Sequence, residues 1–139
     1  MQDQKVLSRL DELLAPAVVP VLTVARVGDA LPLARALADG GLTTLEITLR
    51  TPTAISAIRA INEAMPEVAV GAGTVRSPEQ AQTVIDAGAK FIVSPGMTPR
   101  LIEAAQRWPV PFLPGAATAS EAMALADMGY GILKFFPAE

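Results

Sequence analysis

Ionisable side chains lie inside two segments that otherwise resemble buried strands. In Thr44–Arg50, polar and apolar residues alternate, which places Glu46 on the same face as Arg50. Thr48 lies between them on that face. The third ionisable residue, Lys134, has two apolar residues on each side. Because buried parallel strands are almost continuously apolar, these side chains are expected to face an interior that holds water, a partner or a ligand.

Lys134 has a residue type and a setting suited to covalent chemistry. Loss of solvation destabilises its ammonium form and favours the free amine, which can attack a ketone to form a Schiff base. Two structural interpretations stay open: an ion pair between Lys134 and Glu46, or a lysine whose stem is buried while its amine reaches water. With a glutamate and an arginine on another strand, the sequence favours the catalytic interpretation.

The composition narrows the available chemistry. The 139 residues include no Cys and no His, which excludes disulfides, a thiolate nucleophile, a Ser-His-Asp triad and imidazole-based zinc sites. The net charge of −3 argues against a nucleic-acid-binding surface. The most apolar stretch, Leu13–Leu22, is short and contains two prolines, so it cannot span a membrane. With no signal-peptide pattern at the N-terminus, we expect a soluble cytoplasmic protein with neither nucleic-acid nor membrane partners.

Strand-like and helix-like segments alternate along the whole chain. This pattern predicts an α/β fold with a parallel sheet and right-handed crossovers, either open or closed as a barrel. Residues 1–15 are expected to form an extra helix that covers one end of the sheet, and no linker divides residues 1–139 into further domains. The expected strands are Val18–Val24, Thr44–Leu49, Val68–Ala72, Phe91–Ser94, Val110–Leu113 and Ile132–Phe136.

Residues typical of helix starts and helix ends flank the expected helices. Asp29 is expected to precede the second helix, and Thr51, Ser77 and Thr98 are each followed by a proline suited to the first helical turn. Ser77 and Thr118 also have a Gln or Glu three residues later, the spacing of a capping box. The expected helix ends are marked by the pair Gly40–Gly41, by Gly88 and by Gly129, where a left-handed residue would let the chain turn back toward the next strand.

Short loops follow the expected strands at the end where parallel α/β proteins bind ligands. In Gly71–Thr74, two glycines would let the backbone approach a ligand, and a threonine hydroxyl follows. Ser94–Gly96 and Leu113–Gly115 are similar tight exits, although each loop could serve only as a turn. None of them matches a P-loop or a dinucleotide-binding fingerprint.

In order and spacing, these segments resemble the 2-keto-3-deoxy-6-phosphogluconate (KDPG) aldolases and 4-hydroxy-2-oxoglutarate (KHG) aldolases. The resemblance implies a (β/α)8 TIM barrel, of which this chain would hold about six of the eight βα units. It also implies a homotrimer that acts in the Entner–Doudoroff pathway without metal or other cofactor. The motifs that carry the resemblance are Val18–Val21, Leu45–Thr51, Val70–Val75, Ser94–Gly96, Pro114–Gly115 and Lys134–Glu139.

The resemblance also implies the reaction and its two catalytic residues. Lys134 matches the family's Schiff-base lysine, and Glu46 matches its general acid/base. The implied reaction is cleavage of KDPG to pyruvate and glyceraldehyde 3-phosphate. Many members of the family also cleave KHG to pyruvate and glyoxylate.

Four further residues match substrate-binding positions of the family. Arg50 and Thr74 would bind the carboxylate of the 2-keto acid, for which a guanidinium offers a fork of donors. Pro95 and Phe136 would help to line the pyruvate pocket. The phosphate-binding residues are expected beyond Glu139, since barrel phosphate sites usually come from the loops after strands seven and eight.

Two alternatives stay open. A chain that stops after the sixth strand could be a non-catalytic barrel fragment or scaffold piece, with unpaired strand edges. The related aldolases for 2-keto-3-deoxy-6-phosphogalactonate share the lysine and the glutamate. However, Leu49–Thr51 and the Phe135–Glu139 ending resemble the gluconate enzymes more closely.

Overall fold

A parallel sheet forms the centre of the molecule. The structure, a computed structural model, describes residues 2–138. Five strands pair in chain order: β1 (Val21–Leu22), β2 (Thr44–Thr48), β3 (Ala69–Gly73), β4 (Ile92–Val93) and β5 (Phe112–Leu113). A second parallel pair consists of β6 (Gly115–Ala116) and β7 (Lys134–Phe135).

The second pair continues the first sheet. Only Pro114 separates β5 from β6, and the backbone N–H of Lys134 donates to the Pro114 carbonyl at 2.9 Å. The strands therefore follow one another in chain order at six positions, as the sequence predicts. Several are shorter than predicted, because ladder pairing at β1, β4, β5 and β7 covers only two residues each.

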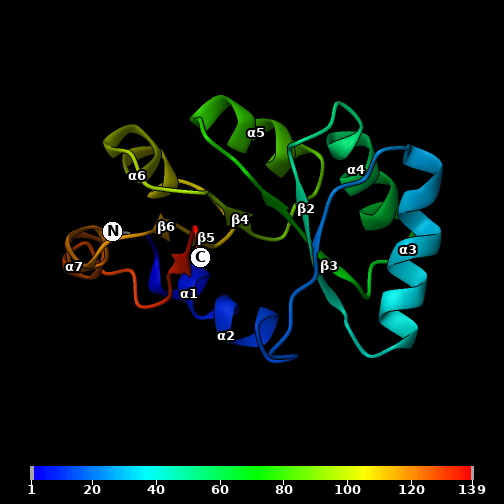
Figure 1. The fold of residues 1–139 in the computed structure, drawn as a ribbon, viewed down its shortest axis with the longest axis horizontal. Helices are drawn as coiled ribbons and strands as arrows, with labels where there is room; N and C mark the ends of the chain where they lie inside the picture. The colour runs from blue at the N-terminus through cyan, green and yellow to red at the C-terminus, as the bar shows by residue number, and fades with distance from the viewer. Residues whose placement is uncertain (1, 139) are drawn as a thin grey trace.

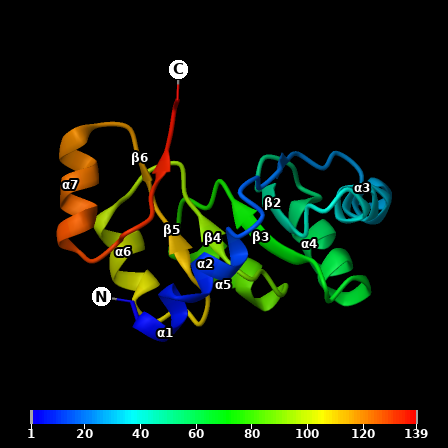
Figure 2. The same cartoon turned by 90° about the horizontal axis from the view of Figure 1, so that it is seen from below.

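Five helices connect successive strands and lie on the outside of the sheet. They follow one another from α3 at one end to α7 at the other (Figures 1 and 2). Two shorter helices precede β1, and Ser8 divides the single helix predicted there. The helices are α1 (Gln4–Leu7), α2 (Arg9–Leu13), α3 (Val27–Asp39), α4 (Ala54–Ala64), α5 (Pro78–Asp86), α6 (Pro99–Ala105) and α7 (Ala119–Asp127).

Most of the predicted helix starts are confirmed. Thr98 and Ser77 cap α6 and α5, each with proline in the first turn. Thr118 and Glu121 form a complete capping box at α7. At α5 the box is incomplete, because the Gln80 side chain accepts a hydrogen bond from the backbone of Arg76.

The predicted helix starts at Thr51 and Asp29 are wrong. Tertiary contacts explain why α4 begins later than predicted. The Thr51 and Thr53 hydroxyls both donate to the Val24 carbonyl, at 2.7 and 2.5 Å, so this loop is tied to the chain beyond β1 and α4 begins only at Ala54. Helix α3 begins at Val27, and Asp29 falls within its first turn, paired with Arg26.

The predicted helix ends are confirmed, with a left-handed glycine at each of them. Gly41, Gly88 and Gly129 have φ values of 91°, 95° and 90°. In the Gly40–Gly41 pair the left-handed residue is Gly41, because Gly40 has a φ of −81° and serves as the C-cap of α3. The chain therefore reverses at Gly41 before entering β2.

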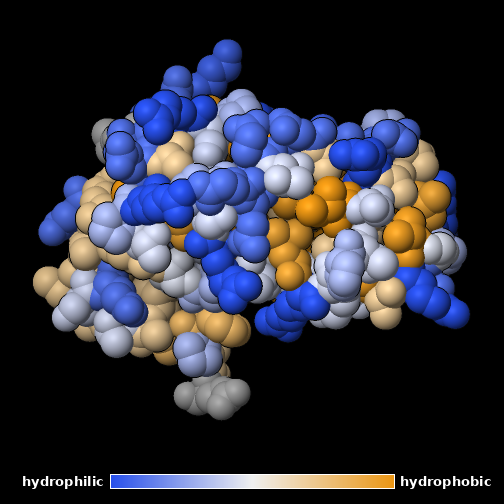
Figure 3. Space-filling view, turned by 90° about the horizontal axis from the view of Figure 1, so that it is seen from above, coloured by the Kyte–Doolittle hydropathy of each residue, from blue (hydrophilic) through white to orange (hydrophobic). Residues whose placement is uncertain are grey.

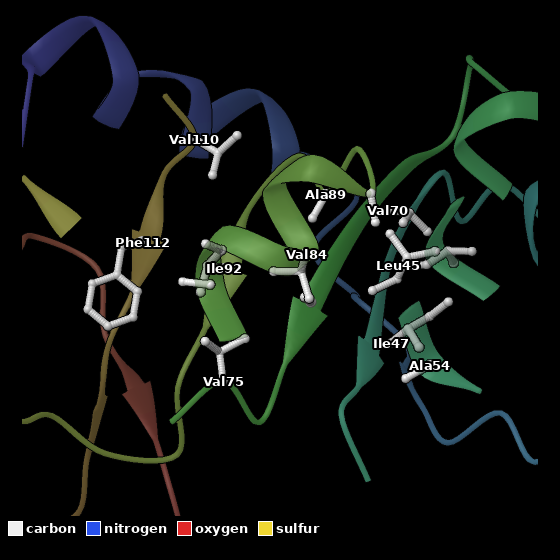
Figure 4. Close-up of a cluster of buried hydrophobic side chains, with 14 of the residues drawn as sticks. Leu45, Ile47, Ala54, Val70, Val75, Val84, Ala89, Ile92, Val110 and Phe112 are labelled. Carbon is white, nitrogen blue, oxygen red and sulfur yellow. The ribbon is translucent and has the colours of Figure 1, made fainter. Parts of the chain in front are cut away.

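The hydrophobic core lies between the outer face of the sheet and its helices. Leu45 and Ile47 of β2 are fully buried there, as the alternation of that strand predicts. Near β5, the Phe112 ring contacts Trp108 and Tyr130 edge to face, with centroids 5.3 and 5.9 Å away. Figure 4 shows part of this core, including Leu45, Ile47, Ala54, Val70, Val75, Val84, Ala89, Ile92, Val110 and Phe112.

The outer surface is mixed in polarity. On the face in Figure 3, hydrophilic side chains are spread among smaller apolar areas. Within residues 2–138, no helix combines the length and the apolar character needed to cross a membrane.

Candidate active site

Strand β2 carries Glu46 into the interior of the molecule. All five β2 residues are buried, and while Leu45 and Ile47 pack on the outer face, Glu46 and Thr48 lie on the inner one. The Thr48 hydroxyl donates to the Leu22 carbonyl at 3.1 Å. Only 5% of Glu46 is exposed, so its carboxylate needs a partner inside the protein.

Lys134 of β7 is that partner. Its Nζ lies 3.4 Å from Glu46 Oε1, although the two residues are 88 positions apart in the sequence. The lysine side chain is 21% exposed and the glutamate side chain 6%. The structure thus brings together the two residues that the sequence singled out for catalysis.

This contact requires a strongly curved sheet. Strands β3, β4 and the continuous β5–β6 segment lie between β2 and β7. Four strand spacings in a flat sheet would separate β2 from β7 by about 19 Å, which is farther than lysine and glutamate side chains can bridge. The sheet therefore curls around its inner face, as strands of a barrel do.

An aromatic ring covers the lysine from another side. The centre of the Phe136 ring is 5.1 Å from Lys134 Nζ, within the range of a cation–π interaction. Phe136 is held in place by its backbone N–H, which donates to the Ala116 carbonyl at 3.1 Å. The amine therefore has an apolar surface and a carboxylate beside it, an arrangement suited to a nucleophile with an adjacent acid/base.

The loop after β4 also reaches this region. The backbone of Pro95 packs directly against Gly115, where a Cβ would overlap with it and would lie 2.7 Å from the Ser94 carbonyl oxygen. Gly115 is the register partner of Lys134 in the β6–β7 pair. Pro95 thus lies one strand away from the lysine.

Thr74 has an unusual backbone conformation at the end of β3. Its φ is 60°, in the left-handed region that a β-branched residue rarely adopts. Strain of this kind is concentrated at functional sites. The Thr74 side chain is half-buried, at the end of the strand where the sequence predicts substrate binding.

Arg50 is more exposed than the two members of the pair. It follows β2 and is exposed, and within residues 2–138 its guanidinium forms neither a hydrogen bond nor an ion pair. A free guanidinium at this end of the sheet is available to an anion. The carboxylate-binding roles of Arg50 and Thr74 stay predictions.

The glycines of β3 have neighbours that the sequence did not reveal. The ring of Phe91 packs against Gly71, and the side chain of Glu46 packs against Gly73. The sequence predicts a ligand near these glycines, whereas side chains of the same chain occupy these two places. The only signal in the sequence was glycine within a strand, which often marks a close approach.

A comparison of the whole chain with known protein families gives a match. A family model described as KDPG and KHG aldolase matches residues 10–139. This chain belongs to the KDPG and KHG aldolase family.

Relatives within this aldolase family are about 50% identical to the chain over the matched residues. The KHG/KDPG aldolase of Escherichia coli K12 is 50% identical over 122 residues, which cover 88% of this chain and 57% of the relative. The 2-dehydro-3-deoxy-phosphogluconate aldolase of Pseudomonas aeruginosa is 48% identical over 133 residues, covering 95% and 60%. The chain thus spans less than two thirds of the length of these relatives.

A solved aldolase structure has the same fold over the shared region. The KDPG aldolase of Legionella pneumophila, solved with pyruvate captured at low pH as a covalent carbinolamine intermediate, is 48% identical, with a TM-score of 0.84. The match covers 86% of this chain and 58% of that one. Together with the parallel βα order, this similarity confirms the predicted barrel-type fold.

The described residues offer no cluster of metal ligands. Within residues 2–138, no group of three or more Asp or Glu side chains is placed to hold a metal ion. The candidate site contains one lysine, one carboxylate and a phenylalanine ring, with the loop after β4 nearby. That the reaction needs no cofactor stays a prediction.

Proposed function

We propose that this chain carries the catalytic centre of a class I aldolase that cleaves KDPG to pyruvate and glyceraldehyde 3-phosphate. The observation that carries the proposal is the contact between Lys134 Nζ and Glu46 Oε1 on the inner face of the sheet. A metal-independent aldol cleavage needs an amine that can condense with a ketone and an acid/base next to it. The lysine and the glutamate supply both.

In the proposed mechanism, Lys134 is the nucleophile. Its ammonium group first gives up a proton to solvent, and the amine attacks the C2 ketone of the substrate. The resulting carbinolamine takes up a proton and loses water to give an iminium ion. The carbinolamine captured in the Legionella relative is an intermediate of this kind. The iminium then serves as the electron sink for the next step.

Glu46 carries out the proton transfers. It removes the proton of the C4 hydroxyl while the C3–C4 bond breaks, and the bonding electrons move to the iminium nitrogen to give an enamine. Glyceraldehyde 3-phosphate leaves as the aldehyde. The enamine is then protonated at C3, by Glu46 or a water that Glu46 orients, and hydrolysis of the iminium releases pyruvate and the free amine.

The remaining predicted residues would bind the part of the substrate common to all 2-keto acids. Arg50 and Thr74, at the ends of β2 and β3, would hold the carboxylate. Pro95 and Phe136 would line the space around the pyruvate carbons, which the nearness of the Phe136 ring to Lys134 supports. Because KHG presents the same keto-acid end, we propose its cleavage to pyruvate and glyoxylate as a second activity.

Family membership also supports an assembly and a place in the cell. We propose a cytoplasmic homotrimer that works in the Entner–Doudoroff pathway. We also favour the gluconate over the galactonate epimer, because the Leu49–Thr51 and Phe135–Glu139 motifs resemble the gluconate enzymes. Sedimentation tests the homotrimer, and cleavage rates on the two epimers test the preference for the gluconate epimer.

Trapping of pyruvate tests the proposed chemistry. The protein is incubated with pyruvate and borohydride, digested, and its peptides are analysed by mass spectrometry. We expect the mass of reduced pyruvate on the peptide that contains Lys134, and no such mass on Lys90 or in the Lys134→Arg variant. A folded protein that gives no adduct on Lys134 contradicts the Schiff-base role and favours the non-catalytic alternative.

A further inference from the structure

Gly73 lies directly against the end of the Glu46 side chain. A Cβ at position 73 would be 2.7 Å from Cδ and 2.8 Å from Cγ of Glu46, and closer still to Oε1. Real Cβ atoms do not approach other heavy atoms within 3.0 Å. The space that a side chain at position 73 would fill is therefore already occupied by Glu46.

The register of the sheet explains this contact. Glu46 is opposite Gly71, and Thr48 is opposite Gly73, so the Glu46 side chain leans along the strands to reach the next inward-facing position of β3. Side chains on strands lean along the strand direction in this way. Because Gly73 has no side chain, the end of Glu46 can occupy the place that a Cβ would take.

The glycine is needed for space and not for its backbone conformation. Gly73 lies within β3 and its φ is outside the left-handed range, so alanine could adopt the same backbone. The glycines of this chain that do need a left-handed conformation are Gly41, Gly88 and Gly129. A substitution at Gly73 would therefore act mainly on what touches it.

A methyl group at position 73 could not be avoided by a small rotation of the carboxylate. Three consecutive atoms of Glu46 lie against Gly73, so the whole end of the side chain would have to move. The Glu46 atom closest to such a methyl group, Oε1, is also the one that lies 3.4 Å from Lys134 Nζ. A side chain at position 73 would therefore also change the distance between the Glu46 carboxylate and the Lys134 amine.

We propose that Gly73 is a positioning residue, whose missing side chain sets the place of the Glu46 carboxylate beside the Lys134 amine. This inference rests on the proposed function, because the proposed mechanism assigns the proton transfers to Glu46. It makes a specific prediction about Gly73→Ala. Schiff-base formation, which needs Lys134, should survive, whereas proton transfer, which needs the position of Glu46, should slow down.

The two steps can be measured separately with pyruvate alone. Borohydride trapping reports on the bond between Lys134 and pyruvate. Exchange of the pyruvate methyl protons for deuterium, followed by NMR in D2O, reports on removal and return of a proton at C3 of the Schiff base. Neither measurement needs an aldehyde or a phosphate.

For Gly73→Ala we expect trapping on Lys134 at a rate near that of the unchanged protein. We expect deuterium exchange to fall between about 10- and 100-fold, since an error of about 1 Å in a catalytic group has an effect of this size. Glu46→Gln should behave in the same way. Gly131→Ala is the matched control, because a Cβ there has no atom within 4 Å, and it should leave both rates unchanged.

A rescue distinguishes positioning from general damage to the fold. Glu46→Asp draws the carboxylate back by one methylene and frees part of the space above Gly73. Added to Glu46→Asp, the Gly73→Ala change should reduce exchange and thermal stability less than it does in the unchanged protein, a non-additivity that a double-mutant cycle measures. The stability cycle applies even if Gly73→Ala folds poorly.

The outcomes separate this inference from the function on which it rests. If the unchanged protein does not trap pyruvate, both are overturned. If it traps pyruvate and Gly73→Ala exchanges deuterium at the normal rate, only the positioning role is overturned. Equal penalties for Gly73→Ala with Glu46 and with Asp at position 46 also overturn it.

Discussion

Lys134 and Glu46 form an ion pair whose two members differ in exposure: 21% of the lysine side chain is accessible, but only 6% of the glutamate side chain. Loss of the lysine would leave a buried carboxylate without its cation. Removing one member of a buried pair is more damaging than replacing both, because the remaining charge stays out of water.

We therefore expect Lys134→Met to lower the free energy of unfolding by about 1–3 kcal/mol, less than for a fully buried pair because the lysine is partly exposed. The Lys134→Met/Glu46→Gln double variant should recover part of this loss. Urea unfolding of these three proteins measures both effects. Equal stability of Lys134→Met and the unchanged protein would show that the carboxylate does not depend on this partner.

Replacement of Thr74 by glycine should stabilise the protein, although Thr74 is a predicted substrate-binding residue. Its φ of 60° strains a β-branched residue and suits glycine. We expect Thr74→Gly to raise the free energy of unfolding by about 1 kcal/mol and to weaken pyruvate trapping at low pyruvate concentration. Thr74→Val, which keeps the branched shape and removes the hydroxyl, should weaken trapping without the gain in stability. A loss of stability in Thr74→Gly contradicts the idea that strain is stored here.

Gln2 should contribute to stability through hydrogen bonds to the start of β5. Its Nε2 donates to the Val110 carbonyl at 2.7 Å, its Oε1 accepts from the Phe112 N–H at 3.2 Å, and only 2% of the residue is exposed. Gln2→Ala would leave these buried backbone groups without partners, which lowers the free energy of unfolding by about 1–3 kcal/mol. The exposed Gln4→Ala variant should change it by less than about 0.5 kcal/mol. Thermal unfolding of the two variants tests this difference, and an equal effect would be the contrary result.

The pH dependence of stability should include a contribution from Glu121. Hydrogen bonds from the backbone N–H groups of Ala117 and Thr118, and then the Thr118 side chain, lower the pKa of Glu121 below its ordinary value of 4.5. A carboxyl with a lower pKa in the folded state stabilises the protein above its unfolded-state pKa. This contribution is lost as the pH falls through the folded-state pKa. Acid titration of the unfolding midpoint should therefore show a smaller decline below about pH 4.5 in Glu121→Gln. Parallel curves for the two proteins would contradict this assignment.

Much of the fold follows from local sequence signals. Thr98 with Pro99, and Thr118 with Glu121, mark helix starts through contacts within one turn, so their outcome depends little on the rest of the chain. A prediction from local signals fails where a residue bonds to a distant part of the chain, as at the predicted start of α4. The hydroxyls of Thr51 and Thr53 bond to Val24, more than 25 residues away, and that partner cannot be seen in the local pattern.

The sequence by itself determined which residues could do the chemistry. Without Cys or His, a lysine and a glutamate at strand positions were the available pair, and the alternation of polar and apolar residues around Glu46 predicted its inner face. Only the tertiary structure decided that Lys134 and Glu46 meet and that Gly73 makes room for the carboxylate. The physical reason is that both contacts join residues on different strands, so they depend on the curvature and register of the sheet, and no local pattern encodes that geometry.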